Sequence, residues 1–396
     1  MQQMWLILLI AGSLGLSACQ PQEIVVEVTR LVENQDIQEV REVTRIVPAT
    51  VVQEATRLVS ENVIVEVTKS PLGTEARPVQ LLFSPTVDTA VIGRRGNELA
   101  QALTEETGYK FVVGILDDEQ AVIDLMCSAP LETIGFLSAS GYVLAREKCG
   151  VQAGSVAVGN DGYTWQTGMI VTRRDSGIDN LDELAGKSWA VAGNDNIANR
   201  LYFQALFEEE GIEPGDILEV SGDSAAMLAV YEGEVDFATA AFVPPVMPYE
   251  ERLWDYDEDD PEPGRYLGIP PQRSPIGYVL VNGEPEFGGY RLRDARSRIF
   301  DVEPEIYDRT QIVSISAQIP NDTVTFGHDF PLGLARQVTT TLTEFAASEA
   351  CATSICATDF FGWTGLLPAN DEIFESIGFV QETLNLSADE MLGFTR

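Results

Sequence analysis

Two short polar loops, each between an expected strand and an expected helix, carry side chains suited to binding a small molecule. They are residues 193–196 and residues 221–224. Carboxylates, amides and hydroxyls at such places bind ligands directly, and the start of each helix adds unpaired main-chain N–H groups. The alternative role for the two aspartates is helix capping, because Asp is a favoured N-cap residue. The binding residues predicted here are Asp195, Asn196, Asp223 and Ser224.

These loops belong to a regular alternation of strands and helices. Apolar runs predict strands at 170–172, 188–192, 217–220 and 235–239. Helices are expected at 179–184, 197–210 and 225–231, with Gly186 and Gly211 at positions that end two of them. Strands that alternate with helices predict a parallel sheet, in which ligands bind outside the carboxyl ends of the strands. The fold class is therefore α/β.

The preceding part of the chain repeats this pattern. Strands are expected at 79–83, 110–115 and 133–137, and helices at 92–107, 118–127 and 138–148. The loops that follow these strands offer further hydroxyl groups, each of which is also suited to a cap or turn. These additional candidates are Ser84, Thr86, Ser138 and Ser140.

Three segments in order resemble the phosphate, phosphite and phosphonate type of substrate-binding protein of ABC transporters. They are residues 175–187 (DSGIDNLDELAGK), 229–236 (AVYEGEVD) and 318–322 (QIPND), and the resemblance extends over about 79–386. It implies a two-lobed periplasmic-binding-protein fold, in which each lobe is a central, mostly parallel sheet flanked by helices. Crossing strands join the lobes, and the ligand is captured between them by hinge closure. The implied partners are a small-molecule ligand and an ABC transporter permease, the protein is a monomer, and it is not an enzyme.

The resemblance also assigns domain boundaries. The first lobe takes residues 78–167 and 318–396, and the second takes residues 168–317. Residues 244–287 do not fit the family outline, because this segment is rich in proline and acidic residues. It is predicted to be a mobile surface insertion. A lid or docking surface that uses Trp254 and Tyr256 is the alternative.

The residues that bind the anion in this family are replaced in this chain. A Ser-Thr-Ser run falls on residues 195–197, a histidine falls on Asp223, and two aromatic hydroxyls fall on Glu119 and Leu137. Anion donors are thus lost and carboxylates gained at Glu119, Asp195 and Asp223. Two like charges about 4 Å apart repel by roughly 4 kcal/mol at an effective dielectric of 20. We therefore expect weak phosphonate binding, and a cation, a zwitterion or a neutral polar molecule as the ligand.

Composition excludes several classes of function. The chain has 25 basic and 62 acidic residues, which give a formal charge of −37 and argue against nucleic acid as a partner. His328 is the single histidine, and no Cys-x-x-Cys spacing occurs, so no metal and no cofactor are expected. No catalytic triad or phosphate-binding glycine loop is evident.

The N-terminal segment indicates export. Residues 5–16 are apolar but too short to span a bilayer, and Leu16-Ser17-Ala18-Cys19 resembles a bacterial lipoprotein cleavage box. The expected outcome is lipidation of Cys19 and an extracytoplasmic location on the membrane. An uncleaved anchor or an ordinary signal peptide is the alternative, and residues 1–5 lack the usual Lys or Arg. Residues 20–77 contain a repeated Val-Thr-Arg pattern, which predicts a stalk of extended or helical chain.

Export permits disulfides. With Cys19 set aside, the four remaining cysteines form two local pairs, and we favour Cys127–Cys149 and Cys351–Cys356 among three connectivities. The predicted function is that of a lipid-anchored solute receptor for an ABC importer. Two alternatives stay open at this point: a sensor lipoprotein that serves a signalling receptor, and an enzyme on the same fold, similar to a pyrimidine-synthesis protein.

Overall fold

The computed structural model describes residues 70–192, 196–250, 252–263, 269–274, 277–282 and 288–393. Residues from Pro71 onward form one compact unit. Cys19 and almost all of the expected stalk lie outside the described residues, as does Asp195. Both predicted disulfides are present: Cys127–Cys149 joins two neighbouring helices, and Cys351–Cys356 closes a short turn.

The first of two large sheets is mixed. Its strands run in the order β15 (Gly365–Pro368), β4 (Gln152–Val158), β14 (Thr323–Phe326), β3 (Thr133–Leu137), β1 (Val79–Phe83) and β2 (Phe111–Ile115). β1 pairs in parallel with β2 and β3, whereas β14, β4 and β15 pair antiparallel. The parallel strands are those that the sequence pattern predicts, and the antiparallel ones come from both halves of the chain.

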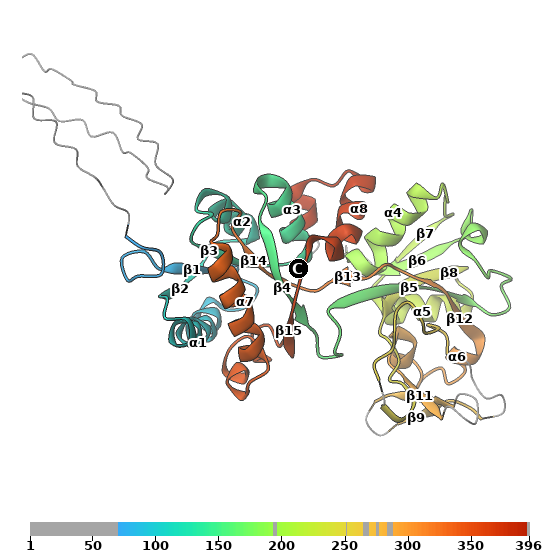
Figure 1. The fold of residues 1–396 in the computed structure, drawn as a ribbon. Coiled ribbons are helices and arrows are strands. Elements are labelled where there is room, and N and C mark those ends of the chain that lie inside the picture. The colour runs from blue at the N-terminus through green and yellow to red at the C-terminus, as the bar shows by residue number, and fades with distance from the viewer. Residues whose placement is uncertain are drawn as a thin grey trace, which may run out of the picture. The chain divides into compact units, whose positions relative to one another are not determined.

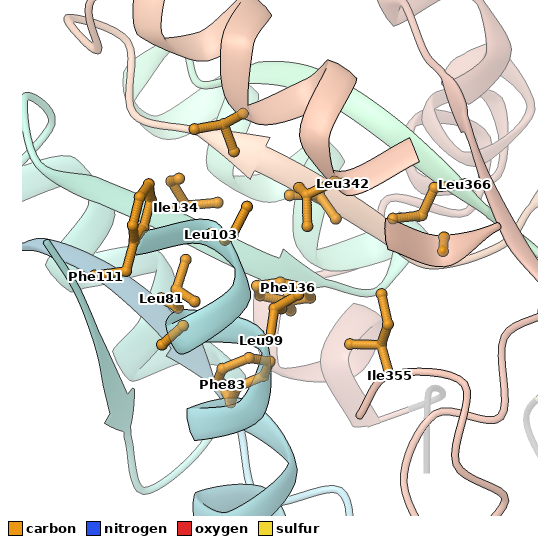
Figure 2. Packing of buried hydrophobic residues seen from close by; sticks show 14 of the residues in the cluster. Leu81, Phe83, Leu99, Leu103, Phe111, Ile134, Phe136, Leu342, Ile355 and Leu366 are labelled. Carbon is orange, nitrogen blue, oxygen red and sulfur yellow. The ribbon is translucent and has the colours of Figure 1, made fainter. Parts of the chain in front are cut away.

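Helices cover both faces of this sheet (Figure 1). Side chains alternate along a strand, so Leu81 and Leu82 of β1 enter two different cores. Leu81 packs with α1 (Thr89–Thr107) and α7 (Leu332–Ala346), as Figure 2 shows. Burying each such leucine or phenylalanine contributes about 1.5–3 kcal/mol. On the other face lie α2 (Glu119–Ser128), α3 (Ala139–Cys149), α8 (Glu375–Leu384) and α9 (Ala388–Gly393).

The second large sheet is also mixed. Its order is β12 (Thr310–Ile315), β5 (Trp165–Arg173), β8 (Phe237–Phe242), β6 (Trp189–Ala192) and β7 (Ile217–Val220), and β13 (Ile319–Pro320) adds to one end of β5. β6 lies parallel to β7 and β8, and the other pairs are antiparallel. The flanking helical segments are η1 (Leu181–Leu184), η2 (Ile197–Leu201), α4 (Tyr202–Glu209) and α5 (Asp223–Glu232). Two helix-flanked α/β sheets are thus confirmed.

Two segments connect the sheets. The chain leaves the first sheet at the end of β4 and enters the second at the start of β5. It returns through β13, which pairs with Trp165 and Gln166 of β5, and then continues as β14. The outgoing and returning segments therefore lie side by side. The outgoing link lies between β4 and β5, and the returning link lies between β12 and β13.

The segment that follows β8 is packed rather than loosely attached. After η3 (Pro248–Glu250), the Trp254 side chain is 2% exposed and belongs to a core of the second sheet. The Tyr256 hydroxyl donates to the Ser316 carbonyl oxygen at 2.9 Å. The prediction of a mobile surface insertion is wrong for these residues, because their aromatic rings pack into or against the core of the second sheet. A small antiparallel sheet and two short helices complete the region: β9 (Gln272–Arg273), β10 (Val279–Asn282), β11 (Gly289–Leu292), η4 (Ala295–Arg298) and α6 (Ile306–Arg309).

A buried ion cluster fastens this region to the second sheet. Arg296 has no solvent exposure and donates to the carboxylates of Asp294 and Glu262, both at 2.9 Å. Glu262 also accepts hydrogen bonds from Arg174 and from the main-chain N–H of Ile312. A buried guanidinium needs such acceptors, because an uncompensated charge in the interior is strongly destabilising.

We predict that Asp294→Asn lowers the free energy of unfolding by about 3 kcal/mol, because the buried Arg296 loses one of its two carboxylate partners. Asp301→Asn is the matched control. Asp301 pairs with Arg273 at 2.8 Å but is 67% exposed, and such surface pairs contribute less than about 1 kcal/mol. Urea unfolding followed by circular dichroism measures both values. Equal losses in the two variants would contradict this account of the cluster.

Candidate functional site

A cleft of about 470 Å³ lies where the crossing segments meet the starts of two helices. Its volume is in the range of small-molecule sites. The lining residues are Ser138, Ala139 and Ser140; Ala157, Gly159 and Gln166; Asn196 and Ile197; Ile319, Pro320, Asn321 and Asp322; and Trp363. Both large sheets therefore contribute to the cleft.

The start of α3 forms one wall of the cleft. Ser138 is the N-cap, and its Oγ accepts the Gly141 N–H at 3.0 Å. Ser140 is fully buried, and its Oγ has no hydrogen-bond partner among the described residues. A buried hydroxyl without a hydrogen bond costs free energy unless a ligand or a water molecule supplies that bond. Ser138 and Ser140, two of the candidate loop residues, thus both line the cleft, and Ser138 also serves as the cap that was its alternative role.

The start of η2 forms the opposing wall. Asn196 is the N-cap, and its Oδ1 accepts the N–H groups of Ala198 and Asn199 at 2.9 and 3.2 Å. Asn196 thus both caps the helix and lines the cleft. The capping role that was the alternative for Asp195 belongs to Asn196.

Asp223 does not line the cleft. It lies in the first turn of α5, where its Oδ1 accepts from the Asn199 side chain and its Oδ2 accepts from the Ala241 N–H, both at 3.0 Å. Both oxygens are used to tie α5, η2 and β8 together. Gly222 is the N-cap of α5, so Asp223 is neither the ligand contact nor the cap that the sequence suggested. Its neighbour Ser224 is half-buried and also lies outside the lining.

The remaining predicted residues differ in their distance from the cleft. Ser84 and Thr86 lie in the loop after β1, where the Thr86 N–H donates to the Ser84 carbonyl, and neither lines the cleft. Glu119 lies directly behind the start of α3. It accepts the Ser138 N–H at 2.6 Å and the Ser138 hydroxyl at 3.1 Å, so protein donors already engage its carboxylate.

The most informative residue of the cleft was missed by sequence reasoning. Asp322 lines the cleft, and no ion pair to it is present among the described residues. Burial, and then the charge of Glu119, raise the pKa of Asp322 to about 6, although a hydrogen bond from the Trp363 side chain acts in the opposite direction. The carboxylate is therefore held at a place that lacks a compensating cation. Asp322 is the last residue of the segment 318–322 (QIPND), which the sequence analysis used only as evidence for the family resemblance.

Other missed residues provide neutral polar groups. Gln166 of β5 lines the cleft, as does Asn321, whose Nδ2 donates to the carbonyl oxygens of Ala157 and Tyr163 at 3.1 and 3.0 Å. Trp363 supplies an aromatic wall and stacks on Phe361 at 4.4 Å between ring centroids. Within the described residues, no group of three His, Cys, Asp or Glu side chains is placed to hold a metal ion. The cleft is thus suited to binding a polar molecule through hydrogen bonds and one carboxylate.

Comparison with known proteins gives the following similarities. A binding protein component of an ABC phosphonate transporter from Pseudomonas aeruginosa is 14% identical, with coverage of 82% of this chain and 92% of that chain and a TM-score of 0.38. PhnD1 from Prochlorococcus marinus, in complex with methylphosphonate, is 10% identical, with coverage of 78% and 98% and a TM-score of 0.36. A Xanthomonas citri protein bound to ATP is 12% identical, with coverage of 78% and 98% and a TM-score of 0.47.

No curated protein sequence matches the chain. The family model described as "ABC transporter, phosphonate, periplasmic substrate-binding protein" matches residues 81–374. The matched region includes every lining residue of the cleft.

We predict that Asp322→Asn changes how stability depends on pH. The folded-state pKa of about 6 lies above the usual value of 3.8, so protonated Asp322 adds stability at low pH that is lost as the pH rises through 6. Between about pH 5 and about pH 7.5 the wild type should lose about 1 kcal/mol more than the variant does.

Urea unfolding at the two pH values measures this difference. Asp117→Asn, at an exposed position in the loop before α2, is the control and should follow the wild type. A variant whose pH dependence matches that of the wild type would contradict the placement of Asp322 in a partly buried site without a cation.

Proposed function

Since this chain belongs to the family of periplasmic substrate-binding proteins of phosphonate ABC transporters, we propose that it captures a small polar solute bearing an ammonium group. The chain is a transport binding protein and not an enzyme, and its partners are a solute and an ABC transporter. The ligand class rests on one observation, which is Asp322 in the cleft without a cation.

The charges of the cleft support this ligand class. None of the described lining residues is Lys, Arg or His, whereas Asp322 lines the cleft and Glu119 lies behind it. A phosphonate dianion would meet carboxylates without a basic partner, and like charges about 4 Å apart repel by roughly 4 kcal/mol at an effective dielectric of 20. An ammonium group would instead form a charge-assisted hydrogen bond with Asp322. Neutral oxygens and N–H groups of the same ligand match Asn196, Gln166 and Ser140.

The mode of capture follows from the crossing segments. Rotation about the two links between the sheets would open and close the walls formed by Ser140 and Asn196. A ligand that contacts both walls stabilises the closed form more than the open one, as closure requires.

We predict that amines bind and simple phosphonates do not. Calorimetry on the full chain should compare 1,4-diaminobutane and spermidine, whose ammonium groups carry N–H donors, with methylphosphonate. For an amine that binds, Asp322→Asn should weaken the affinity at least about tenfold, which corresponds to about 1.4 kcal/mol, because the charge partner is removed. Asp117→Asn is again the control and should bind as the wild type does. Tight binding of methylphosphonate, or no binding of any amine, would refute the proposed ligand class.

We further propose a lipid anchor at Cys19 and an extracytoplasmic location. The support is the Leu16–Cys19 segment and the family of the chain. The helices that the structure describes include none long and apolar enough to cross a membrane. Expression in a bacterium fed an alkyne-labelled fatty acid should label the wild type and leave Cys19→Ala unlabelled. Equal labelling of the two proteins would refute the anchor.

A further inference from the structure

The first turn of α3 presents unused hydrogen-bond donors to the cleft. Of its four leading N–H groups, that of Gly141 donates to Ser138 Oγ and that of Tyr142 donates to the Ser138 carbonyl. The N–H groups of Ala139 and Ser140 have no acceptor among the described residues, and the same holds for the buried Ser140 hydroxyl. Ala139 and Ser140 both line the cleft. Three donors at the positive end of a helix dipole would ordinarily attract an anion.

Glu119 lies against the same turn. Its two carboxylate oxygens accept the main-chain N–H and the hydroxyl of Ser138, at 2.6 and 3.1 Å. The chain makes room for it with a glycine, because a Cβ atom at Gly141 would lie 2.2 Å from Glu119 Oε1. The carboxylate therefore occupies a fixed place at the helix start, where a bound anion would otherwise be stabilised. The negative charge of Glu119 also acts on Asp322, which lines the cleft, and raises its pKa.

We propose that Glu119 determines the charge selectivity of the cleft, as an internal anion that neutralises the start of α3 and prevents phosphonate or phosphate from binding there. The unused N–H and hydroxyl groups of Ala139 and Ser140 then donate hydrogen bonds to a neutral ligand oxygen, such as that of a hydroxyl or a carbonyl. This inference rests on the proposed function, because it names the feature by which the cleft favours solutes without a free anionic group at that wall. The second observation that carries it is the buried, unpaired Ser140 hydroxyl at the same turn.

The test removes the charge in two ways. Glu119→Gln keeps an acceptor oxygen for Ser138 and loses the charge, whereas Glu119→Ala removes both. Asp124→Asn is the matched control, since Asp124 lies on the same helix α2 but pairs with Lys148 in the last turn of α3, away from the start of that helix. The probes are methylphosphonate and methanesulfonate, titrated calorimetrically into the full-length proteins at neutral pH.

We expect wild type and Asp124→Asn to bind both anions weakly or not at all. Glu119→Gln and Glu119→Ala should bind methylphosphonate at least about tenfold more tightly than Asp124→Asn does. Ser140→Ala added to either Glu119 variant should reverse part of the gain, because it removes one of the three donors. Circular dichroism verifies folding, and Glu119→Gln decides the result if Glu119→Ala does not fold.

Two results would overturn the assignment. One is anion binding by folded Glu119 variants that is no stronger than that of Asp124→Asn. The other is wild-type binding of methylphosphonate as tight as that of the variants. The proposed ligand class is tested separately. It fails if the wild type binds no amine, whether or not the Glu119 variants bind anions.

Discussion

The close approach of β5 to the start of η2 is the constraint on which the cleft depends. A Cβ atom at Gly168 would lie 2.2 Å from the carbonyl oxygen of Ala198, so this contact requires glycine. The Gly168 N–H also donates to the Ser316 hydroxyl at 2.8 Å, and the Ser316 N–H donates to the Gly168 carbonyl oxygen at 2.9 Å. Gly168 therefore holds η2 and the returning segment against one strand. This contact positions η2, and with it Asn196, against β5 and the returning segment.

The packed segment after β8 reinforces the same junction. Tyr163 and Trp165 flank the outgoing link, and the Trp254 N–H donates to the Tyr163 hydroxyl at 3.0 Å. The Tyr256 hydroxyl donates to Ser316, the residue that also bonds Gly168. Because these aromatic side chains are held by both hydrogen bonds and ring contacts, the segment braces the links between the sheets. The proline and acid content of the segment does not reveal this role, because composition does not show which side chains pack; Pro244, Pro245 and Pro263 are themselves buried.

Local sequence signals predicted the elements well and the site less well. β1, β3 and α1 follow from short apolar runs and from a glycine end at Gly108, which are properties of neighbouring residues. The start of α3 was also predictable, because Ser138 is a cap that needs no distant partner. The position of Asp322 depends on the pairing of β13 with β5 and on contact with Trp363, which lies far away in the chain. No local pattern encodes that pairing, so the acid of the cleft was visible only in three dimensions.

The hydrogen-bond partners of four carboxylates show why the sequence alone did not indicate which acid lines the cleft. Glu119 and Asp223 each accept two protein donors, one of them a main-chain N–H group. Asp236 does the same with the N–H and hydroxyl of Ser188. A carboxylate satisfied in this way serves as an acceptor for the fold, and a ligand would have to displace those donors to use it. Asp322 has no main-chain donor among the described residues, and the Trp363 side chain donates to it. A ligand could therefore use Asp322 without displacing a main-chain donor, which is why we propose Asp322, among the four, as the group that would recognise the solute.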